Sequence, residues 1–340
     1  MNALSRLLAS GRPLLADGAT GTNLFAMGLT SGDAPERWNL EHPDRVRELH
    51  RRFVEAGADV VLTNTFGANA RRLALHGLDT RVREVNRVAA QLARSVADAA
   101  GRTVVVGGSV GPTGELFEPL GALTESAAVE VFAEQIAGLA EGGADVAWIE
   151  TMSALEEIRA AVLAAAQVGL PCTFTASFDT AGRTMMGVTP QALVAFAQSL
   201  EPRPLAIGAN CGVGAADLVM SVLGLTAHDA GIPVIAKANA GIPRVSGAHV
   251  HYSGTPDLMA RYVELAADAG ARIIGGCCGT GFDHLAAMRA ALDAHGGGER
   301  PDEARVVEML GPLQAPAARI GEAASPREGR RSRRPGPPVG

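Results

Sequence analysis

Short apolar runs recur along the chain at intervals that leave room for a helix between successive runs. Eight such runs are expected to be strands, at 14–16, 60–62, 103–106, 146–149, 173–176, 205–207, 234–236 and 273–274. Short, nearly continuous apolar runs are typical of strands in a parallel sheet, because helices cover both faces of such a sheet. The pattern therefore predicts a chain built from alternating strands and helices.

Several stretches between these runs have the periodicity of amphipathic helices, at 44–56, 81–99, 127–140 and 154–166. Three helix ends share one pattern, in which a glycine cap (Gly57, Gly143 or Gly270) shortly precedes a strand. Eight βα units in this order predict a closed parallel (β/α)8 TIM barrel with helices outside. The alternative is an open doubly wound sheet, which usually has fewer strands and a Gly-x-Gly-x-x-Gly fingerprint after the first one. Here Asp17-Gly18-Ala19-Thr20-Gly21-Thr22 follows the first strand and does not fit that spacing.

The barrel is expected to occupy residues 1–310 as one domain. A chain of 340 residues could form two domains, but α/β barrels of this size are often a single unit. Residues 311–340 are rich in Pro, Arg, Gly, Ser and Ala and have almost no bulky apolar side chains, so we expect a disordered basic tail. The run at 330–334 could contact an anionic surface, although a solvated tail without a partner is the favoured interpretation.

Composition and charge narrow the partners and the compartment. The formal net charge of −6 argues against a nucleic-acid partner, which would require a clustered basic face. The first residues contain no apolar segment of the kind found in a secretion signal, and no later apolar run approaches membrane-spanning length. Four cysteines in a chain of this length do not make a disulfide framework. We therefore expect a cytoplasmic protein, either monomeric or a homo-oligomer.

Three of the cysteines follow the sixth and eighth predicted strands. Cys211 lies in Gly-Ala-Asn-Cys-Gly-Val-Gly, and Cys277 and Cys278 lie in Gly-Gly-Cys-Cys-Gly-Thr. Isolated free cysteines are usually small buried hydrophobes, as we expect for Cys172. Glycines on both sides instead suggest backbone passing close to a ligand. Three thiolates brought together at the strand ends would form a zinc site with one open position, which is typical of a catalytic zinc ion.

Other polar residues follow the predicted strands, at the end of a barrel where active sites form. They are Asp17, Gly18, Thr63, Asn64, Ser109, Glu150, Asn210 and Asn239. Asp17 and Glu150 could act as acid and base, or could hold a cationic group such as the ammonium of an amino acid. The structural alternatives are a turn cap for Asp17 and an ion pair for Glu150. Asn64 and Asn239 could orient a ligand or satisfy strand-end backbone, and the loop that contains Tyr252 could be a lid.

The motifs together resemble the homocysteine S-methyltransferase family, over about residues 10–295. The matching segments are Asp17-Gly18-Ala19-Thr20-Gly21-Thr22, Thr63-Asn64-Thr65-Phe66, Gly111-Pro112-Thr113, Glu150-Thr151, Asn210-Cys211 and Gly275-Gly276-Cys277-Cys278-Gly279-Thr280. The resemblance implies a TIM barrel with Zn²⁺ on Cys211, Cys277 and Cys278, and with Asn239 as a displaceable fourth ligand. It also implies that homocysteine is held through its amino group by Asp17 and Glu150, and is methylated to methionine as a zinc-bound thiolate.

From the resemblance and the strand ends we expect the substrate to be bound by Asp17, Gly18, Thr63, Asn64, Ser109, Glu150 and Asn210, with the three cysteines and Glu150 as the catalytic groups. Betaine is the favoured methyl donor, because residues 41–50 resemble the matching segment of betaine enzymes and we expect the chain to act without a cobalamin domain of its own. Two aromatic residues of the animal betaine enzymes, near Gly67 and at Thr151, are missing here. Ala238-Asn239-Ala240-Gly241 is more similar to the homocysteine module of methionine synthase. Trp38 is the nearby aromatic residue that could replace the missing ones.

The alternative donors are S-methylmethionine and a methylcorrinoid or methyltetrahydrofolate system with a separate cobalamin protein. Two alternatives belong to other classes. One is a barrel enzyme that binds phosphate in the glycine-rich loops after strands seven and eight, although this leaves the paired cysteines without a use. The other is a non-catalytic subunit that binds homocysteine or zinc. Production of methionine by the purified chain would separate the enzyme from such a subunit.

Overall fold

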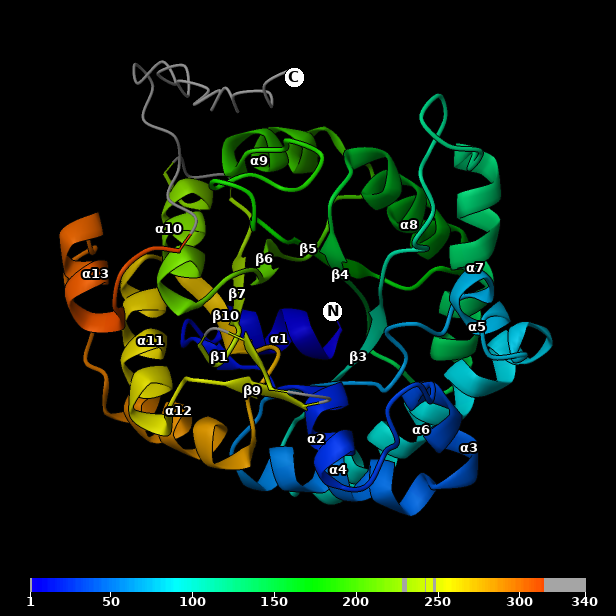
Figure 1. Ribbon diagram of the computed structural model, residues 1–340, viewed down its shortest axis with the longest axis horizontal. Helices are drawn as coiled ribbons and strands as arrows, with labels where there is room; N and C mark the ends of the chain where they lie inside the picture. Colours follow the sequence, from blue (N-terminus) through cyan, green and yellow to red (C-terminus); the bar gives the residue numbers. More distant parts are fainter. Residues whose placement is uncertain (1, 228–230, 242, 247–248, 315–340) are drawn as a thin grey trace, which may run out of the picture.

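The computed structural model describes residues 2–227, 231–241, 243–246 and 249–314. Eight parallel strands form one sheet in the order β1-β10-β7-β6-β5-β4-β3-β2. A parallel bridge between Ala16 and Val60 joins the first strand of this sheet to the last, so the sheet closes into a barrel with helices outside (Figure 1). The predicted TIM barrel is therefore confirmed.

The barrel strands are β1 (Leu14–Leu15), β2 (Val60–Leu62), β3 (Val105–Val110), β4 (Val146–Met152), β5 (Cys172–Ala176), β6 (Ile207–Cys211), β7 (Val234–Ala238) and β10 (Ala271–Gly276). A separate antiparallel pair follows β7 and consists of β8 (Pro243–Ser246) and β9 (His249–Tyr252). The helices are α1 (Ala3–Ala9), α2 (Thr20–Ala26), α3 (Trp38–Glu41), α4 (Pro43–Glu55), α5 (Ala70–Ala74), α6 (Val82–Ala99), α7 (Glu125–Glu141), α8 (Leu155–Val168), α9 (Pro190–Ser199), α10 (Ala215–Leu225), α11 (Pro256–Asp268), α12 (Phe282–Ala294) and α13 (Glu303–Leu310), with 3-10 helices η1 (Pro35–Arg37) and η2 (Asp79–Arg81).

The four predicted helices correspond to α4, α6, α7 and α8. The glycines predicted to end helices adopt the left-handed conformation, with φ of 104° at Gly57, 92° at Gly143 and 99° at Gly270. A residue with a Cβ is disfavoured in this region, which explains the repeated glycine. The helix-to-strand transitions were therefore predicted correctly.

Five barrel strands (β3, β4, β6, β7 and β10) run further than their apolar residues indicated, and β3 and β6 extend furthest. The predicted strands at 103–106 and 205–207 correspond to β3 and β6, which end at Val110 and Cys211. Parallel pairing continues through the polar positions, with Asn210 opposite Lys237 and Cys211 opposite Ala238. The polar side chains of Asn210 and Lys237 are buried at this level, so the strands continue although the apolar runs have ended. Ser109, Asn210 and Cys211 consequently lie on strands, which hold side chains more rigidly than loops do.

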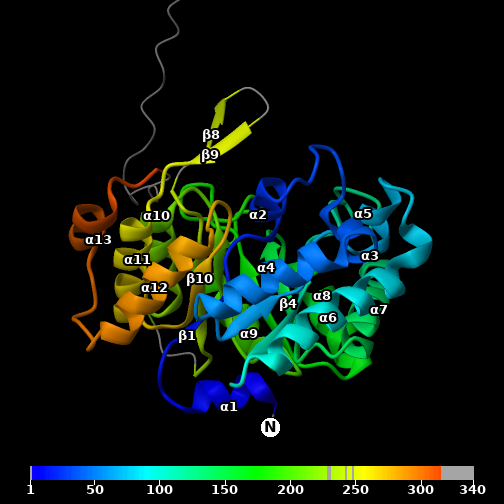
Figure 2. The same cartoon turned by 90° about the horizontal axis from the view of Figure 1, so that it is seen from below.

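The barrel interior and the helix layer form separate cores. Side chains from several strands fill the interior, including Leu14, Val60, Trp148 and Ile235, together with Leu4 of α1. Helix α1 lies across one end of the barrel, and the β8–β9 pair projects from the opposite end (Figure 2). Each end is therefore covered differently, and the cysteines lie at the end that carries β8 and β9.

The predicted boundary between the barrel and a tail at residue 311 stays a prediction. Helix α13 packs against α10 and α11, and the backbone N–H of Gln314 still donates to the Asp217 carboxylate, at 3.0 and 3.2 Å from its two oxygens. The rest of the predicted tail, 315–340, lies outside the described residues. Within the described part of the chain, no helix combines the length and apolar character needed to cross a membrane.

Candidate metal centre

The three predicted cysteines converge on one point. Cys211 is the last residue of β6, and Cys277 and Cys278 directly follow β10. Their sulfur atoms all lie within 4.8 Å of one another, and the Cys211 and Cys278 sulfurs are 3.9 Å apart. Thiolates bound to one tetrahedral zinc ion at about 2.3 Å lie roughly 3.8 Å from each other. The donor set therefore fits a single thiophilic metal ion, and the spacing needs little adjustment.

The three thiols also change one another's acidity. Hydrogen bonds donated to Cys278 by the other two cysteines lower the pKa of this residue to about 3. The same interactions, together with burial, raise the pKa of Cys211 far above its usual value. Cys278 is therefore the most acidic of the three thiols, and it would give an incoming cation its first ligand.

Asn210 supports this centre from the adjacent position on β6. Its Oδ1 accepts hydrogen bonds from the Thr151 backbone N–H (2.9 Å) and from the Thr175 hydroxyl (2.6 Å). Its Nδ2 donates to the Thr151 hydroxyl (2.7 Å) and lies 3.8 Å from the Cys277 sulfur. The amide is thus fixed as a donor towards Cys277. Direct substrate binding by Asn210 stays a prediction. Thr151 lies in a segment that the sequence analysis had identified, whereas Thr175 was not identified.

Asn239 connects both cysteine loops at the end of β7. Its Oδ1 accepts a hydrogen bond from the Cys278 backbone N–H (3.0 Å), and its Nδ2 donates to the Gly212 carbonyl (2.7 Å). Both ends of the amide are therefore engaged with backbone. Its predicted role as a displaceable metal ligand stays a prediction, and it would require Oδ1 to be shared with the metal or to leave Cys278.

Glu150 lies in β4 and belongs to a chain of hydrogen bonds between neighbouring strands. It accepts a hydrogen bond of 2.5 Å from the Ser109 hydroxyl, and the Ser109 backbone N–H donates to the Thr63 hydroxyl (3.0 Å). Burial raises the pKa of Glu150 to about 7, and the positive charge of Lys237 opposes this rise. Ser109 and Thr63 thus orient a carboxylate whose charge has little solvent to stabilise it, which makes a bound cation favourable.

Asp17 forms a buried ion pair with Lys237, a residue that the sequence analysis missed. The Lys237 Nζ lies 2.7 Å from Asp17 Oδ1 and 3.1 Å from the Asp17 carbonyl. Asp17 Oδ2 accepts a hydrogen bond from the Leu62 backbone N–H at 2.7 Å. The exposed fractions of the two side chains are 1% and 2%. A lysine inside β7 was the available signal, because a strand buried on both faces offers it no solvent-exposed position.

A cavity of about 560 Å³ opens beside the cysteines. Eight predicted site residues line it: Gly18, Thr63, Asn64, Ser109, Glu150, Cys211, Cys277 and Cys278. Lys237 also lines it, whereas Asp17, Asn210 and Asn239 are not among its described lining residues. The side chain of Asn64 is already bonded, because its Nδ2 donates to the Pro35 carbonyl (2.7 Å) and to Asn39 (3.1 Å). The structure therefore brings most of the predicted residues together, with Lys237 as the addition.

Tyr252, the last residue of β9, reaches the metal centre from the β8–β9 pair. A hydrogen bond from Tyr252 contributes to the low pKa of Cys278, after the larger contributions of the other two cysteines. Its ring also packs on the loop behind the cysteines, where a Cβ at Gly279 would lie 2.3 Å from the ring. The loop that the sequence left as a possible lid thus contributes a side chain to the site.

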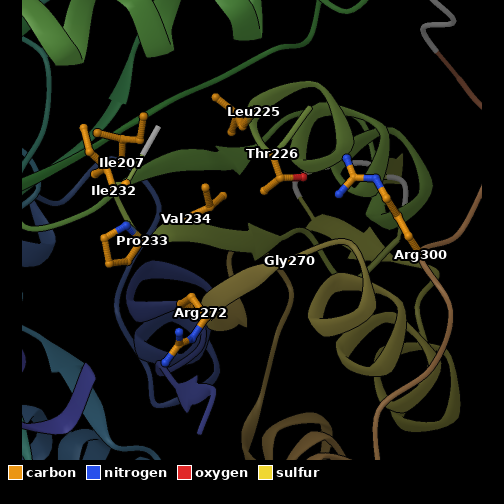
Figure 3. Close-up of a pocket in the computed structure, with 10 residues that line it drawn as sticks. Ile207, Leu225, Thr226, Ile232, Pro233, Val234, Gly270, Arg272 and Arg300 are labelled. Atoms are coloured by element: carbon orange, nitrogen blue, oxygen red, sulfur yellow. The ribbon is translucent and has the colours of Figure 1, made fainter. Parts of the chain in front are cut away.

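A second cavity, of about 460 Å³, lies where β6, β7 and β10 begin, at the opposite end of these strands from the cysteines (Figure 3). The first residues of β6 and β7, Ile207 and Val234, line it. Arg300 donates to the carbonyls of Leu223 (2.9 Å) and Ala269 (3.1 Å), and Arg272 donates to that of Leu8 (3.1 Å). These arginines hold chain segments together, and no predicted site residue lines this cavity.

Comparison with known proteins agrees with this geometry. The family described as homocysteine S-methyltransferase matches residues 14–292. The methionine synthases of Mycobacterium tuberculosis and Mycobacterium leprae are each 34% identical over 83% of this chain, which spans about a quarter of their length. Among solved structures, the metallated form of the homocysteine methyltransferase MmuM from Escherichia coli matches with a TM-score of 0.73 and 26% identity, over 85% of this chain and 99% of that chain.

Proposed function

Because the chain belongs to the homocysteine S-methyltransferase family, we propose that it transfers a methyl group to the sulfur of homocysteine and produces methionine. The observation that carries this proposal is the arrangement of three cysteine sulfurs within 4.8 Å of one another at the wall of a cavity that Glu150 also lines. The sulfurs can hold a metal that binds a substrate thiol, and Glu150 can bind an ammonium group. An amino acid that carries a thiol satisfies both requirements.

Zinc is the metal that we propose for Cys211, Cys277 and Cys278. Sulfur ligands favour zinc over hard cations such as magnesium, and a three-sulfur set leaves one position open. When bound there, zinc would lower the pKa of the substrate thiol, so that the sulfur reacts as a thiolate. The hydrogen bonds of Asn210 and Asn239 around the cysteine loops would keep the donor set in place, as outer-shell partners do at metal sites.

The other residues bind and orient the substrate. Glu150, fixed by Ser109, would accept the substrate ammonium, and the cavity wall would exclude water from the sulfur. A lone pair of the sulfur forms the new bond to the methyl carbon, while the carbon–nitrogen bond of a quaternary ammonium donor breaks and its electron pair stays on nitrogen. Much of the acceleration would come from holding the two reactants in line.

Betaine remains the donor that we favour, and some of the residues that line the cavity support it. Phe25 and Phe66 line the cavity and are partly exposed, which suits a quaternary ammonium, and Arg72 could bind the betaine carboxylate. Trp38, to which the sequence pointed, is not among the described lining residues. Its ring is 5% exposed and packs edge-on against His42.

A methylated corrinoid delivered by a separate protein is the second candidate donor. The observation that favours it is the 34% identity to methionine synthases, of which this chain matches about a quarter. Such a donor would reach the sulfur through the same cavity.

A donor screen on the zinc-loaded protein tests the proposal. Homocysteine would be offered with betaine, S-methylmethionine or a methylated corrinoid, and methionine would be measured. We expect methionine from betaine, and we expect Cys211→Ser to lose both zinc and turnover, because one metal ligand is removed. If methionine formed only with the methylated corrinoid, this donor would replace betaine in the proposal. Absence of methionine with every donor, from a protein that retains zinc, would favour a non-catalytic binding subunit.

A further inference from the structure

Lys237 stands between Asp17 and the cavity. Its side chain lines the cavity together with Glu150 and Cys277, whereas Asp17 is not among the described lining residues. Both carboxylate oxygens of Asp17 already accept hydrogen bonds, Oδ1 from Lys237 and Oδ2 from the Leu62 backbone N–H. An ammonium group in the cavity would therefore meet a lysine before it reached Asp17, and two cations repel each other.

We propose that Lys237, held in place by Asp17, binds the carboxylate of the amino-acid substrate while Glu150 binds its ammonium group. This inference rests on the proposed function and specifies how the same site recognises its substrate. It reassigns Asp17 from a residue that contacts the ammonium to a positioning residue that acts through Lys237. The amino acid would then be held by one cation and one anion, of which each attracts the group of opposite charge.

The donor geometry of Lys237 leaves room for this contact. An ammonium group has three N–H donors. Two are directed at Asp17, at its carbonyl (3.1 Å) and its Oδ1 (2.7 Å), so one remains for a ligand. The side chain is 2% exposed, and burial makes an unused N–H unfavourable. A carboxylate oxygen in the cavity would satisfy it.

The charges around the cavity support the same assignment. Beside Lys237, the ionisable groups at the cysteine end are Glu150 and the cysteines, which are negative when ionised. A substrate carboxylate placed there without a cation would be repelled by each of them. The described lining residues include one lysine, Lys237, and one arginine, Arg72. Arg72 lies elsewhere in the cavity wall, beside Gly67 and Gly114, and its charge acts to lower the pKa of Glu36. Of the two side chains, Lys237 is therefore the cation nearer to the cysteine sulfurs.

Calorimetry with matched thiols tests the proposal. Homocysteine and 3-aminopropane-1-thiol, which lacks only the carboxylate, would be titrated into zinc-loaded wild type and Asp17→Asn/Lys237→Met. The double variant removes both buried charges, so no unpaired charge is left to destabilise the fold. We expect homocysteine to bind about 10- to 100-fold more weakly to the double variant, because a charge-assisted hydrogen bond is lost. The affinity for the aminothiol should change less than about threefold.

Equal losses for both thiols would overturn the proposal, since the effect would then not depend on the carboxylate. Arg72→Met is the control, and it should leave the preference for homocysteine over the aminothiol intact. Loss of this preference in Arg72→Met alone would assign the carboxylate to Arg72 instead. A zinc-loaded wild type that binds neither thiol would contradict the proposed function as well.

The single variant Asp17→Asn gives an independent test that does not depend on the folding of the double variant. Asparagine can still accept a hydrogen bond from Lys237 and has nearly the same shape as aspartate. We expect the aminothiol to bind this variant within about threefold of wild type. A loss of about tenfold or more would mean that Asp17 contacts the substrate ammonium directly, which would overturn the reassignment.

Discussion

Lys237 and His50 are both fully buried ionisable side chains, but they are accommodated in opposite ways. Lys237 has a carboxylate partner at 2.7 Å, whereas both ring nitrogens of His50 are buried without a hydrogen-bond partner among the described residues. The sequence can indicate that Lys237 is buried, because it lies inside a strand, but the partner of Lys237 and the burial of His50 depend on contacts from distant segments of the chain. The three cysteines were predictable because glycines mark them and because strand order brings their strands together. Their hydrogen bonds to supporting residues were not predictable, since Thr175 carries no local signature and nothing in the sequence around Thr151 shows that it bonds to Asn210.

The stability of the protein should depend on His50 at mildly acidic pH. Burial lowers the pKa of His50 to about 4, whereas an exposed histidine in the unfolded chain titrates near 6.5. The unfolded state therefore binds more protons between these pH values, and stability falls as the pH drops from about 6.5 towards 4. This histidine alone should lower the free energy of unfolding by about 2 kcal/mol between pH 7 and pH 5.

Urea unfolding of wild type and His50→Gln at pH 7 and pH 5 measures this contribution. The glutamine variant loses the titrating group, so its stability should fall by about 2 kcal/mol less than that of the wild type over this interval. Equal losses in the two proteins would show that His50 is not protonated on unfolding. Carboxylates titrate in both proteins, and their effect cancels in the comparison.

At the scale of elements, apolar runs located every barrel strand but misplaced the ends that carry function. The runs stop where polar side chains begin, whereas the hydrogen-bonded ladder continues to Cys211 in β6. Polar residues at the barrel mouth, such as Asn210 and Lys237, are buried. A hydrophobicity pattern cannot predict burial of polar residues. The sequence also does not predict the β8–β9 pair, in which the two strands pair only with each other. Its contact with the site depends on Tyr252, whose partner Cys278 lies 26 positions away in the chain.

Strand β6 should tolerate no side chain at Gly208. A Cβ at this position would lie 2.0 Å from the Ile235 carbonyl oxygen, so Gly208→Ala must push β6 away from β7. We expect a loss of about 2–4 kcal/mol in unfolding free energy and weaker zinc binding, because Cys211 lies three residues further along the same strand. Denaturant unfolding and zinc competition titrations would measure the two effects.

Gly296→Ala is the matched control, since nothing lies within 4 Å of a Cβ there. It should change stability by less than about 0.5 kcal/mol. Wild-type zinc affinity in a destabilised Gly208→Ala protein would show that the position of Cys211 does not depend on the β6–β7 contact.

At the scale of the whole molecule, the two ends of the barrel have different tasks. The carboxyl ends of the strands carry the cysteines and the cavity, and the opposite end carries an ion cluster around Asp59. Asp59 is 4% exposed and contacts Arg12 (2.8 Å), Arg289 (3.3 Å) and the Leu15 backbone N–H (2.9 Å). This division is expected for a TIM barrel, in which the two ends serve chemistry and stability separately. The cytoplasmic location, the oligomeric state and the basic tail stay predictions.

Asp59→Asn should therefore lower stability without changing the site. The amide removes a buried charge that faces three arginines, Arg12, Arg102 and Arg289, and we expect a loss of about 3 kcal/mol. Zinc and homocysteine affinities should stay within about threefold of wild type. Chemical denaturation and calorimetry would measure these quantities, with Asp293→Asn as control, because its carboxylate is 66% exposed and also pairs with Arg289. A tenfold loss of homocysteine affinity in Asp59→Asn would show that the two ends are coupled.

The position of α1 has a practical consequence for attaching the protein to a surface. This helix lies across the barrel end that faces away from the cysteines (Figure 2). Its residue Leu4 packs with the side chains of the barrel interior. A biotin or resin linker attached before Asn2 would extend from the same side of the molecule as α1. The protein would then be tethered with its mouth towards the bulk solution, where small thiols and bulky methyl carriers alike can reach it.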